Sequence, residues 1–153
     1  MRQQNRYDVY APAPLWSDGS EARPLPEHVV SRGDLSLRQE ADRAPIANTE
    51  LLRRGQERYQ IFCTPCHGMA GFGDGVVVAR GFPAPPSYHT AHLRAAPAQH
   101  FFEVITNGYG AMFSYAARVP PRDRWAIIAY IRALQLSQRT HLASVPQGED
   151  ELP

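Results

Sequence analysis

The 153-residue sequence contains no lysine, only two cysteines and no long hydrophobic run. All 16 basic residues are arginines, and because they occur singly or in pairs they do not form the basic stripe that nucleic-acid binding needs. The longest apolar run, residues 125–136, is interrupted by Arg132 and is too short to span a bilayer. Met1 to Asn5 begin no hydrophobic export segment. We therefore expect a soluble chain that binds no nucleic acid.

Proline, glycine and charge divide the chain into three regions. Residues 1–48 contain five prolines and no sustained helical or alternating pattern, which predicts an extended N-terminal arm. Residues 49–141 hold ten arginines and five acids, and apolar residues recur there at helical spacing. Residues 142–153 hold three acids and predict a flexible acidic tail. The chain is thus predicted to be one all-α domain with two appendages.

Three helices are predicted within the 49–141 domain. The first is capped near residue 48 and runs to about residue 63, with Gly55 on its apolar face. Glycine costs a helix about 1 kcal/mol relative to alanine, so Gly55 suggests that another helix packs closely there. The other two helices are expected over residues 97–108 and 120–136.

The stretch from Gly68 to Pro97 is rich in glycine and proline, which predicts irregular backbone. Within it, Gly71 to Gly75 include one carboxylate. Further carboxylates at alternating positions are missing, so a turn is favoured over a calcium or phosphate site.

The two cysteines lie in the motif Cys63-Thr64-Pro65-Cys66-His67, at the end of the first predicted helix. This spacing is typical of covalent haem attachment, because two thiols can add to the haem vinyl groups while His67 reaches the iron. A thioredoxin-like dithiol would need a βαβ pattern, and a zinc site would need further ligands at suitable spacing. Purely structural cysteines are a third alternative. His89 and His92 are interpreted as surface histidines rather than zinc ligands.

Met112 is the predicted second axial ligand of the iron. Met69 follows His67 by only two residues and is too near to reach the opposite haem face, and Met1 begins the arm. Met112 lies 112 − 67 = 45 residues beyond His67, after a helix and a Gly-Tyr-Gly turn. A thioether opposite histidine fills both axial positions and favours electron transfer. The alternative is that Met112 is an ordinary core residue.

Other residues are candidates for contact with the haem. A backbone carbonyl commonly holds the second ring nitrogen of a ligating histidine, and the proline-rich stretch offers Pro86 first and Pro85 second. Aromatic and arginine side chains near the ligands are predicted to pack on the haem or to bind its propionates, with simple core packing as the alternative: Tyr88, Tyr109, Phe113, Arg118 and Trp125.

Residues 49–139 resemble a class I cytochrome c, with a first helix containing Gly55 and Tyr59, the attachment motif, a methionine loop and a closing helix. The resemblance implies crossed N- and C-terminal helices around one haem c. Residues 22–33 and the stretch from Thr106 to Gln135 further resemble the monohaem cytochrome c subunit of bacterial alternative complex III. Phe113 departs from the proline that many class I cytochromes have at that position.

The resemblance implies an electron carrier rather than an enzyme, in a respiratory or photosynthetic chain. Its expected role is as a subunit of a membrane quinol-oxidising complex that passes electrons to a periplasmic carrier or terminal oxidase, with the arm as the docking element. A free-standing periplasmic shuttle is the alternative. A haem sensor or enzyme with an open distal site would bind carbon monoxide readily, and a purely structural haem would tolerate loss of Met112.

We expect the protein to work on the periplasmic side of the cytoplasmic membrane, where haem is attached to such cysteines. Related subunits are exported and lipid-anchored through an amino-terminal cysteine. The chain has no spare cysteine, so the signal peptide and any lipidated residue are expected to be missing from this sequence, and membrane contact is expected only through that anchor or through partner subunits.

Overall fold

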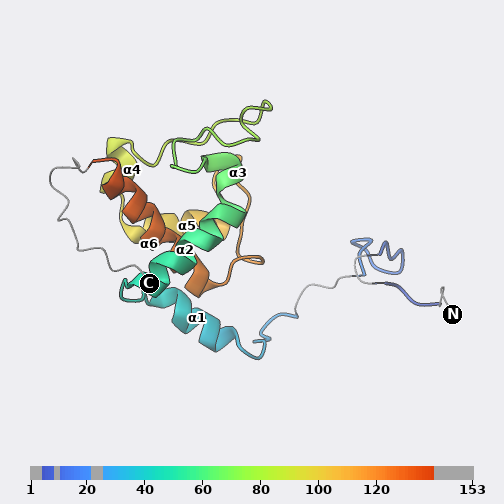
Figure 1. Ribbon diagram of the computed structural model, residues 1–153. Helices are drawn as coiled ribbons and strands as arrows, with labels where there is room; N and C mark the ends of the chain where they lie inside the picture. The colour runs from blue at the N-terminus through green and yellow to red at the C-terminus, as the bar shows by residue number, and fades with distance from the viewer. Residues whose placement is uncertain (1–4, 9–10, 22–25, 140–153) are drawn as a thin grey trace. The chain divides into compact units, whose positions relative to one another are not determined.

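The computed structural model describes residues 5–8, 11–21 and 26–139, and helices are its main regular structure (Figure 1). In these ranges the β-structure consists of two isolated bridges, so the all-α prediction is confirmed. None of the helices in the described ranges is both long enough and apolar enough to cross a membrane. The helices are α1 (Asp34–Asp42), α2 (Thr49–Phe62), α3 (Thr64–His67), α4 (Ala91–Ala95), α5 (Ala98–Asn107) and α6 (Pro121–Ser137).

Helix α2 begins where the sequence predicts it. The side chain of Asn48 accepts a hydrogen bond from the backbone N–H of Leu51 at 2.8 Å, which satisfies one of the free donors of the first turn. Leu51, Gly55 and Tyr59 are the buried residues of this helix, and they lie on one face. Helix α2 packs mainly against α6 (Figure 1).

The contact between α2 and α6 is closest at Gly55, as its position in the first predicted helix suggested. A Cβ atom at this position would overlap the carbonyl oxygen of Ala126 and lie 2.6 Å from the carbonyl carbon. It would also lie 3.1 Å from the Cβ of Tyr130. The absence of a side chain at Gly55 therefore allows the two backbones to approach each other, and the predicted crossing of the first and last helices is confirmed.

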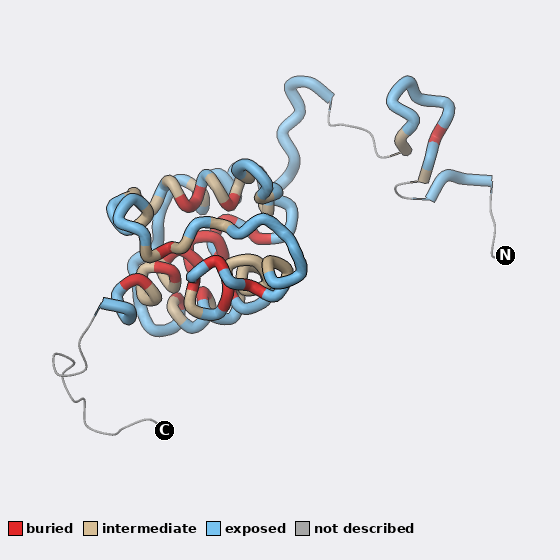
Figure 2. The backbone as a smooth tube through the Cα atoms, turned by 90° about the horizontal axis from the view of Figure 1, so that it is seen from above, coloured by how far each residue is buried: buried red, intermediate tan, exposed pale blue. Residues whose placement is uncertain are grey.

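The core lies between α2, α5 and α6, where buried segments gather in Figure 2. Helix α6 supplies most of its aliphatic groups, including Ile127, Ile128 and Ile131. The ring of Phe102 from α5 stacks on Trp125 with 4.4 Å between centroids. Each residue so buried contributes roughly 1.5–3 kcal/mol of hydrophobic stabilisation.

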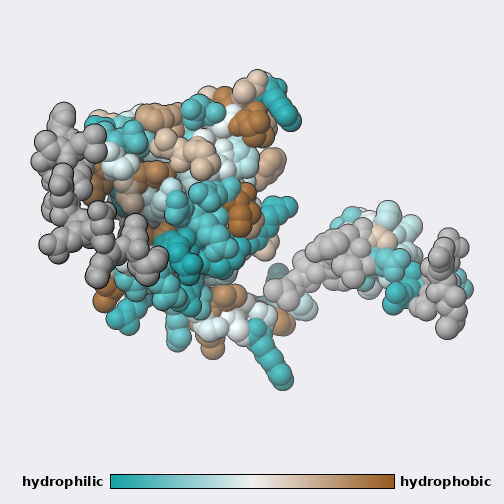
Figure 3. Space-filling view, in the orientation of Figure 1, coloured by the Kyte–Doolittle hydropathy of each residue, from teal (hydrophilic) through white to brown (hydrophobic). Residues whose placement is uncertain are grey.

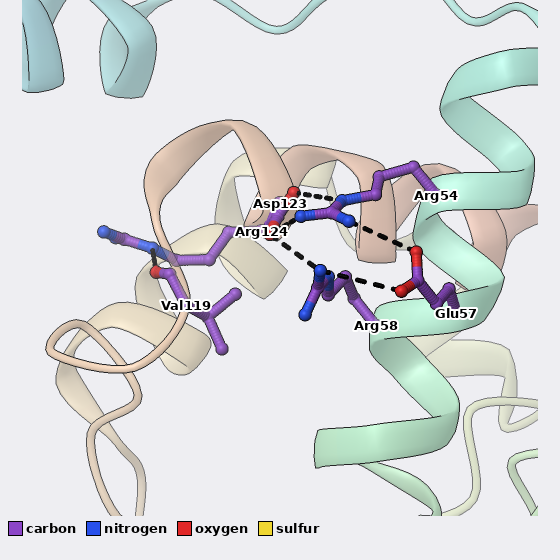
Figure 4. Close-up of polar contacts among 6 residues, drawn as sticks. All are labelled: Arg54, Glu57, Arg58, Val119, Asp123 and Arg124. Atoms are coloured by element: carbon purple, nitrogen blue, oxygen red, sulfur yellow. Dashed lines mark hydrogen bonds and ion pairs between the residues drawn. The ribbon is translucent and has the colours of Figure 1, made fainter.

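A buried carboxylate joins α6 to α2 (Figure 4). The side chain of Asp123 is 8% exposed and accepts two hydrogen bonds from Arg54, at 2.8 and 2.9 Å. Arg58, one turn further along α2, lies 3.4 Å from the same carboxylate. The bidentate geometry fixes the relative position of the two helices along their contact.

Helix α1 corrects the prediction that residues 1–48 are extended throughout. The indole Nε1 of Trp125 donates to the backbone carbonyls of Glu40 and Ala41, at 3.1 and 3.2 Å. Ala41 also packs against the core. These contacts come from a residue more than 80 positions away, so the local sequence pattern did not indicate the helix.

Helix α4 is a second correction, because it lies in the stretch predicted as irregular. The side chain of Thr90 accepts a hydrogen bond from the N–H of Leu93 at 3.3 Å and so caps the first turn of α4. At the other end, Arg132 of α6 donates to the carbonyls of Leu93, Arg94 and Ala96. This short helix is therefore completed by a distant arginine.

The chain separates into two compact units, residues 1–34 and 35–153, so residues 35–48 group with the predicted domain and not with the arm. In the first unit, residues 11–21 fold back on themselves instead of being extended. The N–H of Ala13 donates to the carbonyl of Gly19 at 2.8 Å, and Pro12 pairs with Ser20 in an antiparallel bridge. The predicted tail at 142–153 lies outside the described residues.

Candidate haem site

The attachment motif forms a single turn directly after α2. Cys63 caps the end of α2, and its carbonyl accepts hydrogen bonds from the N–H groups of Cys66 and His67, at 3.2 and 2.9 Å. Pro65 occupies the first turn of α3, where its missing N–H leaves no donor unsatisfied. Both thiols and the imidazole are thus presented by five consecutive residues whose backbone is fixed by hydrogen bonds.

The glycine-rich loop folds back over this turn. Gly73 donates to the carbonyl of His67 at 2.9 Å, and Gly75 donates to the carbonyl of Cys66 at 3.1 Å. A Cβ at Gly75 would overlap the carbonyl oxygen of Pro65. The stretch 71–75 therefore acts as a turn that braces the attachment segment, in agreement with the turn prediction.

Burial sets the protonation of the candidate ligands. Burial lowers the pKa of His67 to about 4, so its imidazole is neutral at physiological pH, as a metal ligand must be. Burial, together with the neighbouring Cys66, raises the pKa of Cys63 to about 12. Neither cysteine is in a disulfide.

The imidazole of His67 stacks on the ring of Tyr88, with 4.7 Å between centroids and 12° between planes. Its Nδ1 atom is buried and has no hydrogen-bond partner. The predicted hydrogen bond to the carbonyl of Pro86 or Pro85 is therefore not formed in the structure. The carbonyl of Pro85 is turned toward Gly73, and Pro86 is exposed.

Tyr59 contributes a contact that its helical position alone did not predict. Its side chain is fully buried, and its hydroxyl donates to the carbonyl of Gly68 at 2.8 Å. The ring lies 6.3 Å from that of Tyr88, at a tilt of 58°. Burial raises the pKa of Tyr59, so the hydroxyl keeps the proton that it donates. The residue after His67 is thus tied to the core.

Met112 lies on a tight loop between α5 and α6. Gly108 ends α5 with a φ of 79°, and Tyr109 and Met112 then exchange two backbone hydrogen bonds of 3.0 Å. The side chains of Met112 and Cys63 both pack against the core cluster that contains Tyr88. The loop also returns to the end of α2, because the ring of Tyr115 lies 6.4 Å from that of Phe62 in an edge-on arrangement.

The end of this loop is held by Arg124, which sequence reasoning did not single out. Its guanidinium donates to the carbonyl of Val119 at 2.9 Å and to the hydroxyl of Thr106 (Figure 4 shows the first contact). It also lies 4.8 Å from the ring centroid of Phe102. The segment that presents Met112 is therefore anchored to both α5 and α6.

The remaining predicted contact residues fall into two groups. Tyr109 and Phe113 are 77% and 78% exposed, and Arg118 is also exposed. Figure 3 shows hydrophobic residues scattered among hydrophilic ones on the surface of the second unit. Trp125, in contrast, is buried against Phe102 and α1, and its indole N–H is already used there. Contact of these residues with a haem stays a prediction.

The two histidines assigned to the surface differ in environment. His92 is exposed, whereas His89 is partly buried and its Nε2 lies 2.7 Å from the carbonyl oxygen of Ala70. The ring of His89 also contacts Phe72 at 4.6 Å between centroids. Within the described part of the chain, no three His, Cys, Asp or Glu side chains are grouped to hold a metal ion.

The residues present fit a covalently attached haem. Two free thiols and a neutral imidazole share one turn, whereas the hydrogen bond that a ligating histidine commonly makes through its second ring nitrogen is not formed at Nδ1 of His67. Met112 packs on the same core as Cys63. This donor set offers one nitrogen, one thioether and two sites for thioether bonds, which is the requirement of a haem c with two axial protein ligands.

Comparison with known proteins gives one family. The model described as cytochrome c oxidase, cbb3-type, subunit III matches residues 50–131. The match includes the attachment turn, the Met112 loop and most of α6. Among curated proteins, no match was found.

Proposed function

Because the chain belongs to the family of cytochrome c oxidase, cbb3-type, subunit III, and is thus a class I c-type cytochrome that transfers electrons through covalently bound haem c, we propose that a single iron is held between His67 and Met112. When bound, haem supplies the ferrous and ferric states that store and release one electron. Cys63 and Cys66 would hold the macrocycle, and His67 and Met112 would together leave no position on the iron for a substrate.

One observation carries this assignment of ligands. The Met112 loop and the Cys63 turn pack against the same core cluster, and Tyr88 of that cluster stacks on His67. His67 and Met112, which are 45 positions apart in the chain, are thus anchored to one set of buried side chains. A soft, uncharged thioether at the second axial position favours the reduced iron and suits electron transfer rather than oxygen chemistry.

The ligand assignment is tested by the spectrum of the oxidised protein at long wavelength, where a weak transition from methionine sulfur to ferric iron appears. We expect the band in the wild type and its loss in Met112→Ala. Met69→Ala is the matched control, because Met69 is 62% exposed and should leave the band unchanged. A wild type without the band, or a Met112→Ala variant that keeps it, would show that Met112 is not the ligand.

We further propose that the protein acts as a subunit of a membrane quinol-oxidising complex like alternative complex III, on the periplasmic side. The likeness of residues 22–33 and 106–135 to that subunit supports this role. A compact first unit, residues 1–34, that is separate from the cytochrome domain also suits a docking element. The partner that receives electrons is then a periplasmic carrier or terminal oxidase.

Co-purification tests the complex. The untagged native protein, extracted with mild detergent, should migrate with an assembly that oxidises quinol, and antibodies against this chain should deplete that activity. Recovery of all of the protein as a free periplasmic species would favour the shuttle and refute the complex. Absence of the methionine-to-iron band would not change the result of the co-purification. The proposal on the iron ligands and the proposal on the membrane complex can therefore be refuted independently.

A further inference from the structure

We propose that Gln135 is a positioning residue that sets the ring plane of the axial ligand His67 through Tyr88. The proposal rests on the role of His67 as ligand. Gln135 lies 68 positions after His67, in the last two turns of α6, and does not belong to the attachment motif. It acts through the backbone and ring of Tyr88.

The first step concerns what orients His67. An imidazole rotates readily about its Cβ–Cγ bond, because this torsion has broad minima. The ring of Tyr88 lies nearly parallel to the imidazole, at 12° and 4.7 Å, and so supplies the restraint. The plane of His67 therefore follows the position of Tyr88.

The second step concerns what fixes Tyr88. Its ring is buried, with Tyr59 at 6.3 Å and Phe101 at 6.1 Å between centroids. Its backbone is held at both polar groups, because the N–H donates to the carbonyl of Gly71 at 2.9 Å and the carbonyl accepts from Nε2 of Gln135 at 2.8 Å. Gln135 is therefore the link between Tyr88 and the rigid helix α6.

The third step concerns the orientation of the Gln135 amide. Arg132 lies one turn earlier on α6 and can only donate, so its Nη1 faces the amide oxygen of Gln135, at 2.8 Å. The amide nitrogen must then face the carbonyls of Tyr88 and Leu93, at 2.8 and 3.3 Å. Because Gln135 is only 6% exposed, water does not readily replace its amide nitrogen as the donor to the carbonyl of Tyr88. Arg132 itself is fixed over the ring of Phe101, at 4.8 Å.

The test uses the ferric haem protein and its low-spin electron paramagnetic resonance signal, whose g values depend on the plane of the axial imidazole. Gln135→Glu keeps the acceptor for Arg132 but removes the donor to Tyr88 at neutral pH. Gln135→Met removes the donor without adding a buried charge, and so covers the case in which the glutamate variant fails to fold. Both variants should shift the g values and the reduction potential relative to the wild type.

Two controls separate positioning from loss of stability. Asp123→Asn weakens the buried pair with Arg54 and should lower the unfolding temperature while leaving the g values unchanged. Tyr88→Phe keeps the stacked ring and should also leave them unchanged, whereas Tyr88→Leu should shift them. Unchanged g values in the folded Gln135 variants, with a lower unfolding temperature alone, would overturn the proposal. A wild type without histidine–methionine signals would instead refute the proposed ligation, and this inference with it.

Discussion

Gly55→Leu should prevent α2 and α6 from packing and leave little folded protein, whereas Gly55→Ala should fold with reduced stability. The Cβ that either residue adds would overlap the Ala126 carbonyl oxygen. Because that obstacle is backbone, α6 as a whole must move, which withdraws the buried isoleucines from the core. Overpacking of this kind costs about 1–3 kcal/mol or more. For alanine, the better helix propensity offsets roughly 1 kcal/mol of that cost.

The measurement is the free energy of unfolding of the haem protein in urea. Gln56→Leu is the matched control, since Gln56 is the next residue on α2 and is exposed, and its replacement should change stability by no more than about 0.5 kcal/mol. A Gly55→Leu protein as stable as the wild type would mean that the two helices do not approach each other as closely as the structure has them.

The close contact at Gly55 was predictable because its signal is local. A glycine on the apolar face of a good helix has few explanations other than a neighbouring backbone. The cap of α2 and the apolar periodicity of α6 are local signals too, because each is contained in the sequence of its own helix. Helices α1 and α4 were missed for the opposite reason. Their ends are completed by Trp125 and Arg132, which are distant in sequence, so a propensity pattern contains no trace of them.

The candidate haem site also combines features that the sequence indicates with features that only the structure shows. The attachment motif is five consecutive residues, and its haem chemistry follows from their spacing alone. The stacking of Tyr88 on His67 and the bond from Gln135 to Tyr88 join residues 21 and 47 positions apart, and only the packed structure reveals them. Trp125 likewise contacts α1 and Phe102 of α5, which its place in the sequence does not indicate, and its contact with a haem stays a prediction.

Replacing both cysteines should abolish covalent attachment of the haem altogether. In the wild type, thioether bonds from Cys63 and Cys66 keep the pigment on the polypeptide after unfolding and in acidified organic solvent. In Cys63→Ala/Cys66→Ala, the axial bonds and the packing are all that remain, and both are lost when the chain unfolds. Haem staining of denaturing gels and solvent extraction should therefore find all of the haem free in the double variant.

Thr64→Ala is the matched control, because Thr64 lies between the cysteines and its hydroxyl donates to the carbonyl of Gln60 at 2.7 Å. The substitution leaves both thiols in place, so the pigment should stay bound. Each single cysteine variant should also retain it, since one bond suffices to survive unfolding. Pigment that leaves the wild type in acidified solvent would refute the attachment itself.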